Sequence, residues 1–223
     1  MKQISEEDKK LVQDVYKMID ASRGDMSKLE KFYDDNAGIY DRFMKAISLH
    51  FEHVAEELRE RCSGRDLSLV NVLDVGAGTG LLGEEMRNKG FSRMDALDMS
   101  KKMLEESKAK DLYTNFFTLP IGEEATPGIA ENSYDAAVAT GVYVEGHAPM
   151  KSLHELVRIV KPGGFIIFSL NDPHFTMNYM QVMGDVMKDG KGELLLMRKM
   201  PYKLEFRNDF KPYYCYLVVF KVL

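Results

Sequence analysis

Short hydrophobic runs alternate with amphipathic segments along most of this chain. The runs are rich in β-branched and aromatic residues, as in buried strands, and most are followed by apolar residues at helical spacing. This pattern predicts strands over 70–75, 94–97, 113–118, 134–140 and 165–170. Because strands that alternate with helices form parallel sheets with right-handed crossovers, we expect an α/β fold with a doubly wound sheet.

The two ends of the chain depart from this alternation. The first 30 residues have a helical pattern, and a further helix is predicted over 43–61. Near the other end, a helix over 178–188 is followed by strands over 193–200 and 213–222 with no helix between them. The sequence therefore predicts a seven-stranded, mostly parallel sheet that ends in an antiparallel hairpin.

With 223 residues, the chain is long enough to form one domain with a full hydrophobic core. We predict one compact domain, in which residues 1–62 are N-terminal helices that cover a ligand cleft and residues 63–223 form the core. In doubly wound sheets this cleft lies outside the carboxyl ends of the strands.

A glycine-rich stretch directly after the first predicted strand marks the centre of this site. The segment reads VNVLDVGAGTGLLG over 70–83, so that Gly76, Gly78 and Gly80 separate the strand from an apolar helix. Glycine permits positive φ and lets a ligand approach the main chain. The start of the helix adds unpaired N–H groups and a partial positive charge. We therefore expect a nucleotide-like ligand at this turn.

The spacing of the glycines has two readings that imply different ligands. Read from Gly78, the spacing with Gly80 and Gly83 is the dinucleotide fingerprint, and Asp98 follows about 20 residues later as the acid that binds ribose. This reading predicts a nicotinamide cofactor.

Read from Gly76, the turn begins where the strand ends, at Val75. Asp74 favours this second reading, because an acid in the last turn of the strand repels a pyrophosphate and suits a ligand with an ammonium or sulfonium centre. We prefer it for both reasons.

Four motifs together resemble those of the class I S-adenosylmethionine-dependent methyltransferases. They are VLDVGAGTG at 72–80, ALDMS at 96–100, YDAAVATGV at 134–142 and HELVRIVKPGGFIIFSL at 154–170. Within that superfamily the chain is similar to the methyltransferase-like proteins named after the Williams–Beuren chromosomal region, over roughly residues 32–223. The resemblance implies a Rossmann-like fold, S-adenosylmethionine as cofactor and S-adenosylhomocysteine as its product.

The resemblance also implies a partner for each part of the cofactor. Asp98, with two carboxylate oxygens, would accept hydrogen bonds from the ribose hydroxyls, and Met99 would lie beside the adenine. Main-chain carbonyls of Gly76 and Thr140 would bind the ammonium group, with Asp74 holding the turn or reached through water. The full set of expected cofactor-binding residues is Tyr33, Tyr40, Asp74, Gly76, Ala77, Gly78, Thr79, Gly80, Leu81, Asp98, Met99, Met103, Leu119, Pro120, Thr140, Gly141 and Val142.

Two of these assignments have alternatives. Tyr33 and Tyr40 belong to a segment that resembles the entry segment of small-molecule methyltransferases, which closes over the methionine end of the cofactor, but both would also suit the core of a helix pair. Leu119 stands where the family usually has an acid or amide for adenine. Either the backbone N–H of Leu119 or the carboxylate of Glu123 would then bind the ring.

The implied reaction is direct displacement at the sulfonium methyl, in which alignment supplies most of the catalysis. A general base is needed only for an acceptor that is protonated at neutral pH. Tyr143, Glu145 and His147 follow the fourth strand, where the acceptor should approach, and we name Tyr143 and His147 as the catalytic candidates. His50 and His53 have the spacing of a metal pair, but no ligand cluster accompanies them in the sequence, so no metal is expected.

The segment NDPHF at 171–175 resembles the signature of amine-methylating enzymes. In those enzymes the signature follows the fourth strand, whereas here it follows the fifth and has Asp172 at its second position. We therefore reject methylation of adenine or glutamine. Residues 171–187 would line the acceptor pocket or form a plain core helix.

Composition narrows the class of partner. The net charge is −5, and no cluster of Lys and Arg indicates a nucleic-acid surface. No apolar run approaches about 18 residues and no segment resembles a signal peptide, so no membrane partner is expected. Two distant cysteines, Cys62 and Cys215, suit a reducing cytosol and predict a cytoplasmic protein. Few residues lie outside the core fold, which favours a small-molecule acceptor, and nothing indicates an oligomeric state.

Two other functions stay open. A protein that binds S-adenosylmethionine or S-adenosylhomocysteine without turnover would fit the missing adenine acid and the uncertain base. A NAD-dependent oxidoreductase would use the glycine reading that starts at Gly78, against which Asp74 and the terminal hairpin argue.

Overall fold

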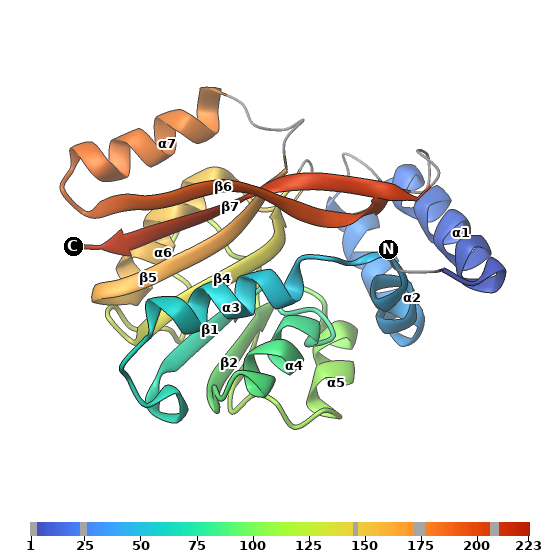
Figure 1. Cartoon of the computed structure of the whole chain (residues 1–223), viewed down its shortest axis with the longest axis horizontal. Helices are drawn as coiled ribbons and strands as arrows, with labels where there is room; N and C mark the ends of the chain where they lie inside the picture. The colour runs from blue at the N-terminus through green and yellow to red at the C-terminus, as the bar shows by residue number, and fades with distance from the viewer. Residues whose placement is uncertain (1–3, 23–25, 145–146, 172–176, 206–209) are drawn as a thin grey trace.

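A twisted sheet with helices on both faces and two further helices beside it makes up the molecule (Figure 1). The computed structural model describes residues 4–22, 26–144, 147–171, 177–205 and 210–223. The helices are α1 (Glu6–Ser22), α2 (Met26–Ile47), α3 (Phe51–Arg61), α4 (Leu81–Asn88), α5 (Lys101–Lys108), α6 (Leu153–Ile159) and α7 (Met177–Lys188), with 3-10 helices η1 (Leu67–Leu69) and η2 (Met150–Ser152). The strands are β1 (Asn71–Val75), β2 (Arg93–Asp98), β3 (Phe116–Thr118), β4 (Tyr134–Tyr143), β5 (Val160–Asn171), β6 (Gly192–Glu205) and β7 (Lys211–Val222).

The strand order is β3-β2-β1-β4-β5-β7-β6. The first five strands pair in parallel, and β7 pairs antiparallel to both β5 and β6. This arrangement confirms the predicted seven-stranded, mostly parallel sheet with a terminal antiparallel hairpin. The chain order reverses between β1 and β4, and open α/β sheets bind ligands at such a switch point.

The sheet has a separate hydrophobic core on each face, because successive side chains of a strand point in opposite directions. Val72 of β1 belongs to the core under α3, α4 and α5, whereas its neighbour Leu73 belongs to the core under α6 and α7. Burial of each such aliphatic side chain contributes about 1.5–3 kcal/mol. The apolar side chains that the amphipathic pattern directs to the two faces thus hold both layers of helices on the sheet.

The helix predicted over 43–61 is two helices, α2 and α3, separated by residues 48–50. At this junction the backbone N–H of Leu49 donates to the carbonyl oxygen of Tyr202 in β6 at 2.9 Å. A backbone group that bonds to a strand cannot also continue a helical ladder, so tertiary pairing overrides the local pattern.

Two central strands are longer than predicted. β4 continues to Tyr143, because Tyr143 pairs with Leu170 of β5. β5 begins at Val160, ahead of the predicted start at 165, and residues 161–164, whose proline and two glycines are typical of a turn, form an irregularity within it where the register shifts. A turn inside a strand is not distinguishable from a turn before a strand by its residues alone.

The helices α1 and α2 lie beside the sheet, where the β6–β7 hairpin reaches past the other strands to meet them (Figure 1). Their apolar residues form a third cluster together with Leu204 of β6. Of the residues 1–62 that we predicted to cover the cleft, those of α3 also pack on the sheet. The division of the chain at residue 62 stays a prediction. None of the helices in the described ranges has the length and hydropathy of a membrane span.

Candidate functional site

A cavity of about 660 Å³ lies at the carboxyl ends of β1, β2 and β4, enclosed by α2 and by the β6–β7 hairpin. Its volume is within the range of about 300–1,000 Å³ that is usual for small-molecule sites. The expected cofactor-binding residues that line it are Tyr33, Tyr40, Gly76, Ala77, Gly78, Thr79, Leu81, Asp98, Met99, Met103, Leu119, Pro120, Thr140, Gly141 and Val142. Asp74 and Gly80 are not part of its wall. The catalytic candidate His147 is part of the wall.

The glycine turn has the conformation that its sequence predicts. Gly76, Gly78 and Gly80 have φ angles of 67°, 54° and 88°, which side chains rarely adopt. A Cβ at Gly76 would lie 2.4 Å from Val142 Cγ2, whereas a Cβ at Gly78 would meet nothing within 4 Å. The main chain at Gly78 is therefore open to a ligand, and the turn begins at Gly76 as the preferred reading requires.

Asp98, at the end of β2, is held by the backbone on both of its carboxylate oxygens. Oδ2 accepts a hydrogen bond from the N–H of Gly78 at 2.8 Å, and Oδ1 accepts one from the N–H of Ser100 at 2.8 Å. Burial raises the pKa of Asp98 above its usual value, and these two donors oppose that rise. Each oxygen keeps lone-pair capacity on a fixed carboxylate that lines the cavity.

Thr79, in the same turn, has a buried hydroxyl with no protein partner. Its Oγ1 is sealed from solvent and makes no hydrogen bond within the described residues, although Thr79 lines the cavity. A buried polar atom without a partner costs about 1–3 kcal/mol. A polar ligand group beside the glycine turn would remove this cost.

The part of the wall that follows β2 and β3 has no polar side chain for an aromatic ring to bond. It is formed by Met99 and Met103 after β2 and by Leu119, Pro120 and Ile121 after β3. The backbone N–H of Leu119, one expected adenine donor, instead donates to the carbonyl oxygen of Asp98 at 3.0 Å.

The carboxylate of Glu123, the other expected partner of adenine, lies 3.5 Å from Lys151 and is not part of the cavity wall. Neither alternative is therefore poised for the ring, and the wall after β3 offers it apolar contact.

Asp74 lies behind the turn, in the core of the sheet. Its carboxylate accepts a hydrogen bond from the hydroxyl of Tyr113 at 2.6 Å. Burial raises the pKa of Asp74 to about 7. The hydroxyl of Tyr113 is also packed against Gly83, where a Cβ would lie only 2.3 Å away. Asp74 thus acts on the turn through Tyr113 and the packing of α4.

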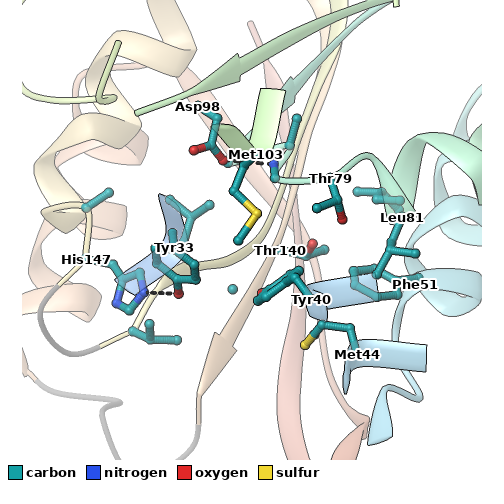
Figure 2. Close-up of a pocket in the computed structure, with 18 of the residues that line it drawn as sticks. Tyr33, Tyr40, Met44, Phe51, Thr79, Leu81, Asp98, Met103, Thr140 and His147 are labelled. Atoms are coloured by element: carbon teal, nitrogen blue, oxygen red, sulfur yellow. Dashed lines mark hydrogen bonds between the residues drawn. The ribbon is translucent and has the colours of Figure 1, made fainter. Parts of the chain in front are cut away.

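Tyr33 of α2 and His147 of the loop after β4 meet across the cavity, although 114 positions separate them. The Tyr33 hydroxyl and His147 Nε2 are 2.8 Å apart (Figure 2). Tyr40 packs against Tyr33 edge to face, with ring centroids 5.8 Å apart. Burial raises the pKa of Tyr33 well above its usual value, so this hydroxyl keeps its proton. Both expected tyrosines therefore face the cavity.

The other catalytic candidate is not at the cavity. Tyr143 is fully buried between the sheet and η2, where its hydroxyl lies 3.1 Å from Ser152 Oγ. The placement contradicts the expected role, because β4 continues to this residue and turns its side chain away from the wall that Val142 lines. Glu145 lies outside the described residues, as does most of the NDPHF segment at 171–175.

Sequence reasoning did not predict how α2 is fixed over the cavity. Ser100 Oγ donates to Asp34 Oδ1 at 2.6 Å, which ties α2 to the start of α5. Lys110 Nζ lies 2.6 Å from Asp41 and 2.8 Å from Glu84. Both contacts join residues far apart in sequence, so no local motif signals them.

Further cavity residues were also missed. They come from α2, α3, β6 and β7: Phe43, Met44, Ile47, His50, Phe51, Tyr202 and Tyr213. Figure 2 shows Phe51 and Leu81 on the opposite side of the view from Tyr33 and His147, with Tyr40 and Met44 of α2 between them. The cavity thus extends beyond the residues of the glycine turn.

The described residues hold no group of three or more His, Cys, Asp or Glu side chains arranged for a metal ion. Cys62 and Cys215 are both buried and unpaired with each other. Burial raises the pKa of each thiol, so neither is a reactive thiolate near neutral pH.

Comparison with known proteins agrees with this geometry. Residues 73–168 match the family described as a methyltransferase domain. Magnesium protoporphyrin IX methyltransferase from Synechocystis PCC 6803, solved with bound S-adenosylmethionine, superimposes with a TM-score of 0.56 and 17% identity, over 77% of this chain and 79% of that one. Residues 73–168 are thus similar to a methyltransferase domain, and the chain has the fold of the class I S-adenosylmethionine-dependent methyltransferases.

Among individual proteins, the chain is 29% identical to human methyltransferase-like protein 27 over 71% of its own length and 64% of the human protein's. It is 34% identical to the malonyl-[acyl-carrier protein] O-methyltransferase of Erwinia pyrifoliae, over 57% of its length and 48% of that protein's. The chain thus spans less than two thirds of these relatives. The predicted resemblance to methyltransferase-like proteins is confirmed.

Proposed function

We propose that this protein transfers a methyl group from S-adenosylmethionine to a small-molecule acceptor. The observation that carries the proposal is the carboxylate of Asp98, fixed by two backbone donors at the wall of the cavity and next to the open main chain of Gly78. A fixed carboxylate with spare lone pairs beside a glycine turn fits a ribose diol. The fold and the match over residues 73–168 support the same reading.

The residues of the cavity fit the other parts of this cofactor as well. The partnerless hydroxyl of Thr79 offers a hydrogen bond to the methionine end, and the carbonyls of Gly76 and Thr140 offer acceptors to its ammonium group. The apolar wall around Met99 and Met103 suits a flat adenine ring. When bound, S-adenosylmethionine supplies an electrophilic methyl on a sulfonium centre.

The protein's own contribution is to hold the acceptor in line and to manage its proton. Tyr33 and His147 share one hydrogen bond at the cavity wall, and an imidazole is the side chain that most often acts as a general base in enzymes. We propose His147 as the general base when the acceptor loses a proton, with Tyr33 orienting its ring. The enclosure of the cavity by α2 excludes water from the reacting groups.

A small-molecule acceptor is supported by this enclosure, since a cavity of about 660 Å³ must hold both reactants. The net charge of −5 argues against a nucleic-acid substrate. The Erwinia relative is named for methylation of a malonyl group on a carrier protein. Two buried, unpaired cysteines support a place in the reducing cytoplasm.

Calorimetric titration with S-adenosylmethionine, S-adenosylhomocysteine and NADH in parallel tests the cofactor. We expect saturable binding of both sulfur compounds and none of NADH. Binding of NADH alone would overturn the proposal in favour of an oxidoreductase that uses the other glycine reading.

Incubation with labelled S-adenosylmethionine and a metabolite extract then tests turnover. Transfer of the label to a small molecule is the expected result. Tight binding with no transfer to any fraction would mean a protein that binds the cofactor without catalysis.

A further inference from the structure

The cavity contains an aromatic compartment that the parts of S-adenosylmethionine assigned above do not use. Its side chains come from α2, the junction between α2 and α3, α3, β6 and β7: Phe43, His50, Phe51, Tyr202 and Tyr213. We call this set the aromatic chamber. Flat apolar side chains of this kind bind rings by stacking and edge contacts. His50 has two ring nitrogens, and only Nδ1 has a hydrogen-bond partner among the described residues.

The break between α2 and α3 places His50 in the chamber. His50 precedes the first turn of α3, and its Nδ1 lies 2.9 Å from the carbonyl oxygen of Tyr202. Its ring is packed against the rings of Phe51 and Tyr202, with centroids 4.2 and 4.4 Å away. The orientation of the imidazole is therefore fixed by one hydrogen bond and two aromatic contacts.

This hydrogen bond also fixes where the proton is. A carbonyl oxygen only accepts, so Nδ1 must donate, and in the neutral ring the lone pair then belongs to Nε2. Burial lowers the pKa of His50 to about 4, with the positive charge of Lys203 and the neighbouring His53 acting in the same direction. The imidazole thus stays neutral, with Nε2 as an acceptor, at neutral pH.

The acceptor atom Nε2 has no partner in the described part of the chain. Nε2 is not fully enclosed by protein atoms, and His50 lines the cavity. The bond to Tyr202 does not by itself account for the histidine, because the N–H of Leu49 donates to the same carbonyl oxygen at 2.9 Å. A smaller donor or no side-chain donor at all would leave that carbonyl satisfied.

We propose that His50 binds the acceptor substrate, by accepting at Nε2 a hydrogen bond from a hydroxyl or N–H group on a flat, apolar molecule held in the aromatic chamber. This inference rests on the proposed function, since it assigns the acceptor of that same site. It gives the acceptor class two features, a ring system that the aromatic side chains contact and a donor group at one edge. Reversed polarity is excluded, because Nε2 carries no proton.

A pair of matched probes tests the hydrogen bond without knowledge of the natural acceptor. The probes are 2-naphthol, which has a hydroxyl donor, and 2-methoxynaphthalene, which has the same ring without one. We expect the protein to bind 2-naphthol more tightly by about 2–10-fold, the range of one neutral hydrogen bond, both with and without S-adenosylhomocysteine. Equal affinity for the two probes would overturn the proposal.

Variants locate the preference at His50. In His50→Asn the side-chain amide keeps a donor for the Tyr202 carbonyl but has no atom at the position of Nε2, so the preference should vanish. His50→Gln returns an acceptor oxygen near that position and should restore part of it. His53→Asn, at an exposed position of the same helix, should leave it unchanged. A preference that persists in His50→Asn would contradict the assignment.

Two further readouts separate this inference from the proposed function. Binding of S-adenosylhomocysteine should change less than about twofold in His50→Asn, because His50 is assigned to the acceptor. If the unchanged protein does not bind S-adenosylhomocysteine at all, the proposed function fails, whereas the assignment of His50 is decided by the naphthol probes. Nitrogen-15 spectra of histidine-labelled protein should show His50 as the neutral tautomer protonated at Nδ1. A proton on Nε2 would overturn the inference even if the cofactor binds.

Discussion

Asp98 and Asp74 are two carboxylates at the same edge of the sheet, on neighbouring strands, and their surroundings give them different roles. Asp98 faces the cavity and is held by two backbone donors, whereas Asp74 is buried and meets the hydroxyl of Tyr113. The first is therefore suited to bind a ligand and the second to maintain the packing behind the turn. Each role has a consequence that a single substitution measures.

Replacement of Asp98 by Ala should weaken the binding of S-adenosylhomocysteine by about 30-fold or more, because hydrogen bonds to a charged group contribute about 1.5–3 kcal/mol each. Asp98→Asn, which keeps the shape and one acceptor oxygen, should show an intermediate loss. Calorimetric titration measures both. Asp95→Asn, on the same strand but outside the cavity wall, serves as the control. Unchanged affinity in the Asp98 variants would exclude the ribose contact.

The buried carboxyl of Asp74 should make the folded protein less stable as pH rises. Its pKa is raised from 3.8 to about 7, so the folded state retains the proton that the unfolded state has already lost. This stabilising proton is fully present below about pH 4 and is lost as pH rises through 7. Asp74→Asn keeps an acceptor for Tyr113 and never ionises. The free energy of unfolding, measured with urea, should therefore fall in the natural protein but not in Asp74→Asn. The difference between the two proteins should grow in favour of the variant by on the order of 2–4 kcal/mol between pH 5 and 8. A constant difference across this range would mean that Asp74 is already ionised in the folded state.

At the scale of elements, we expect α2 to be the wall of the site that moves. Besides its apolar packing against α1 and β6, it is joined to the core by the bond between Ser100 and Asp34, the ion pairs of Lys110, and the contact of Tyr33 with His147. These are polar contacts at the rim of the cavity, which open locally more readily than the cores under the sheet. Binding and release should therefore proceed through movement of α2.

Lys110→Met removes the charge that bridges α2 and α4. Partly exposed ion pairs contribute little to global stability, so the free energy of unfolding should change by less than about 1 kcal/mol. Amide hydrogen exchange in α2 should nevertheless become several-fold faster, and the release of S-adenosylhomocysteine should accelerate. Lys101→Met, which disrupts a surface pair within α5, is the matched control and should change neither rate. Equal exchange in the two variants would show that Lys110 does not hold α2.

At the scale of the whole molecule, the cavity is lined by three parts of the chain that lie far apart in the sequence. The strand ends of β1, β2 and β4 supply one wall, α2 and α3 a second, and the β6–β7 hairpin a third. A ligand that binds the folded state stabilises it by mass action, by about 2.7 kcal/mol at 100 times its dissociation constant. The stabilisation should be distributed over all three walls.

Hydrogen exchange with and without S-adenosylhomocysteine measures this distribution. Added protection should occur in α2 and around Tyr202 as well as at the glycine turn. The helix α7, whose residues do not line the cavity, should be unaffected and provides an internal control. Protection confined to the glycine turn and β2 would show that the outer walls do not respond to the cofactor.

A structural feature could be predicted from the sequence when the residues that determine it are close together in the chain. The parallel strands and the turn at Gly76 were predictable, because hydrophobic runs and glycine spacing are properties of a few neighbouring residues. The break at residues 48–50 depends on the carbonyl of Tyr202, which lies far along the chain. Tyr143 was assigned wrongly for the same reason, since its pairing with Leu170 decides which way it faces.

The candidate site also contains both kinds of feature, those determined by neighbouring residues and those determined by distant ones. The role that we propose for Asp98 is indicated by a short motif, whereas the pairing of Tyr33 with His147 and the position of His50 arise from the packing of separate elements. Residues that act through such contacts leave no pattern in the sequence around them. They become visible when the helices are placed over the sheet.

The position of β7 between β5 and β6 has a consequence for biosynthesis. The glycine turn and Asp98 leave the ribosome early, but β6 has no strand to pair with until β7 has been made and has settled against β5. Until then Tyr202 cannot take its place, and the junction between α2 and α3 has no carbonyl to bond. A nascent chain thus contains the glycine turn and Asp98 before the hairpin that completes the cavity, so we expect the complete cavity to form only after β7 has been synthesised.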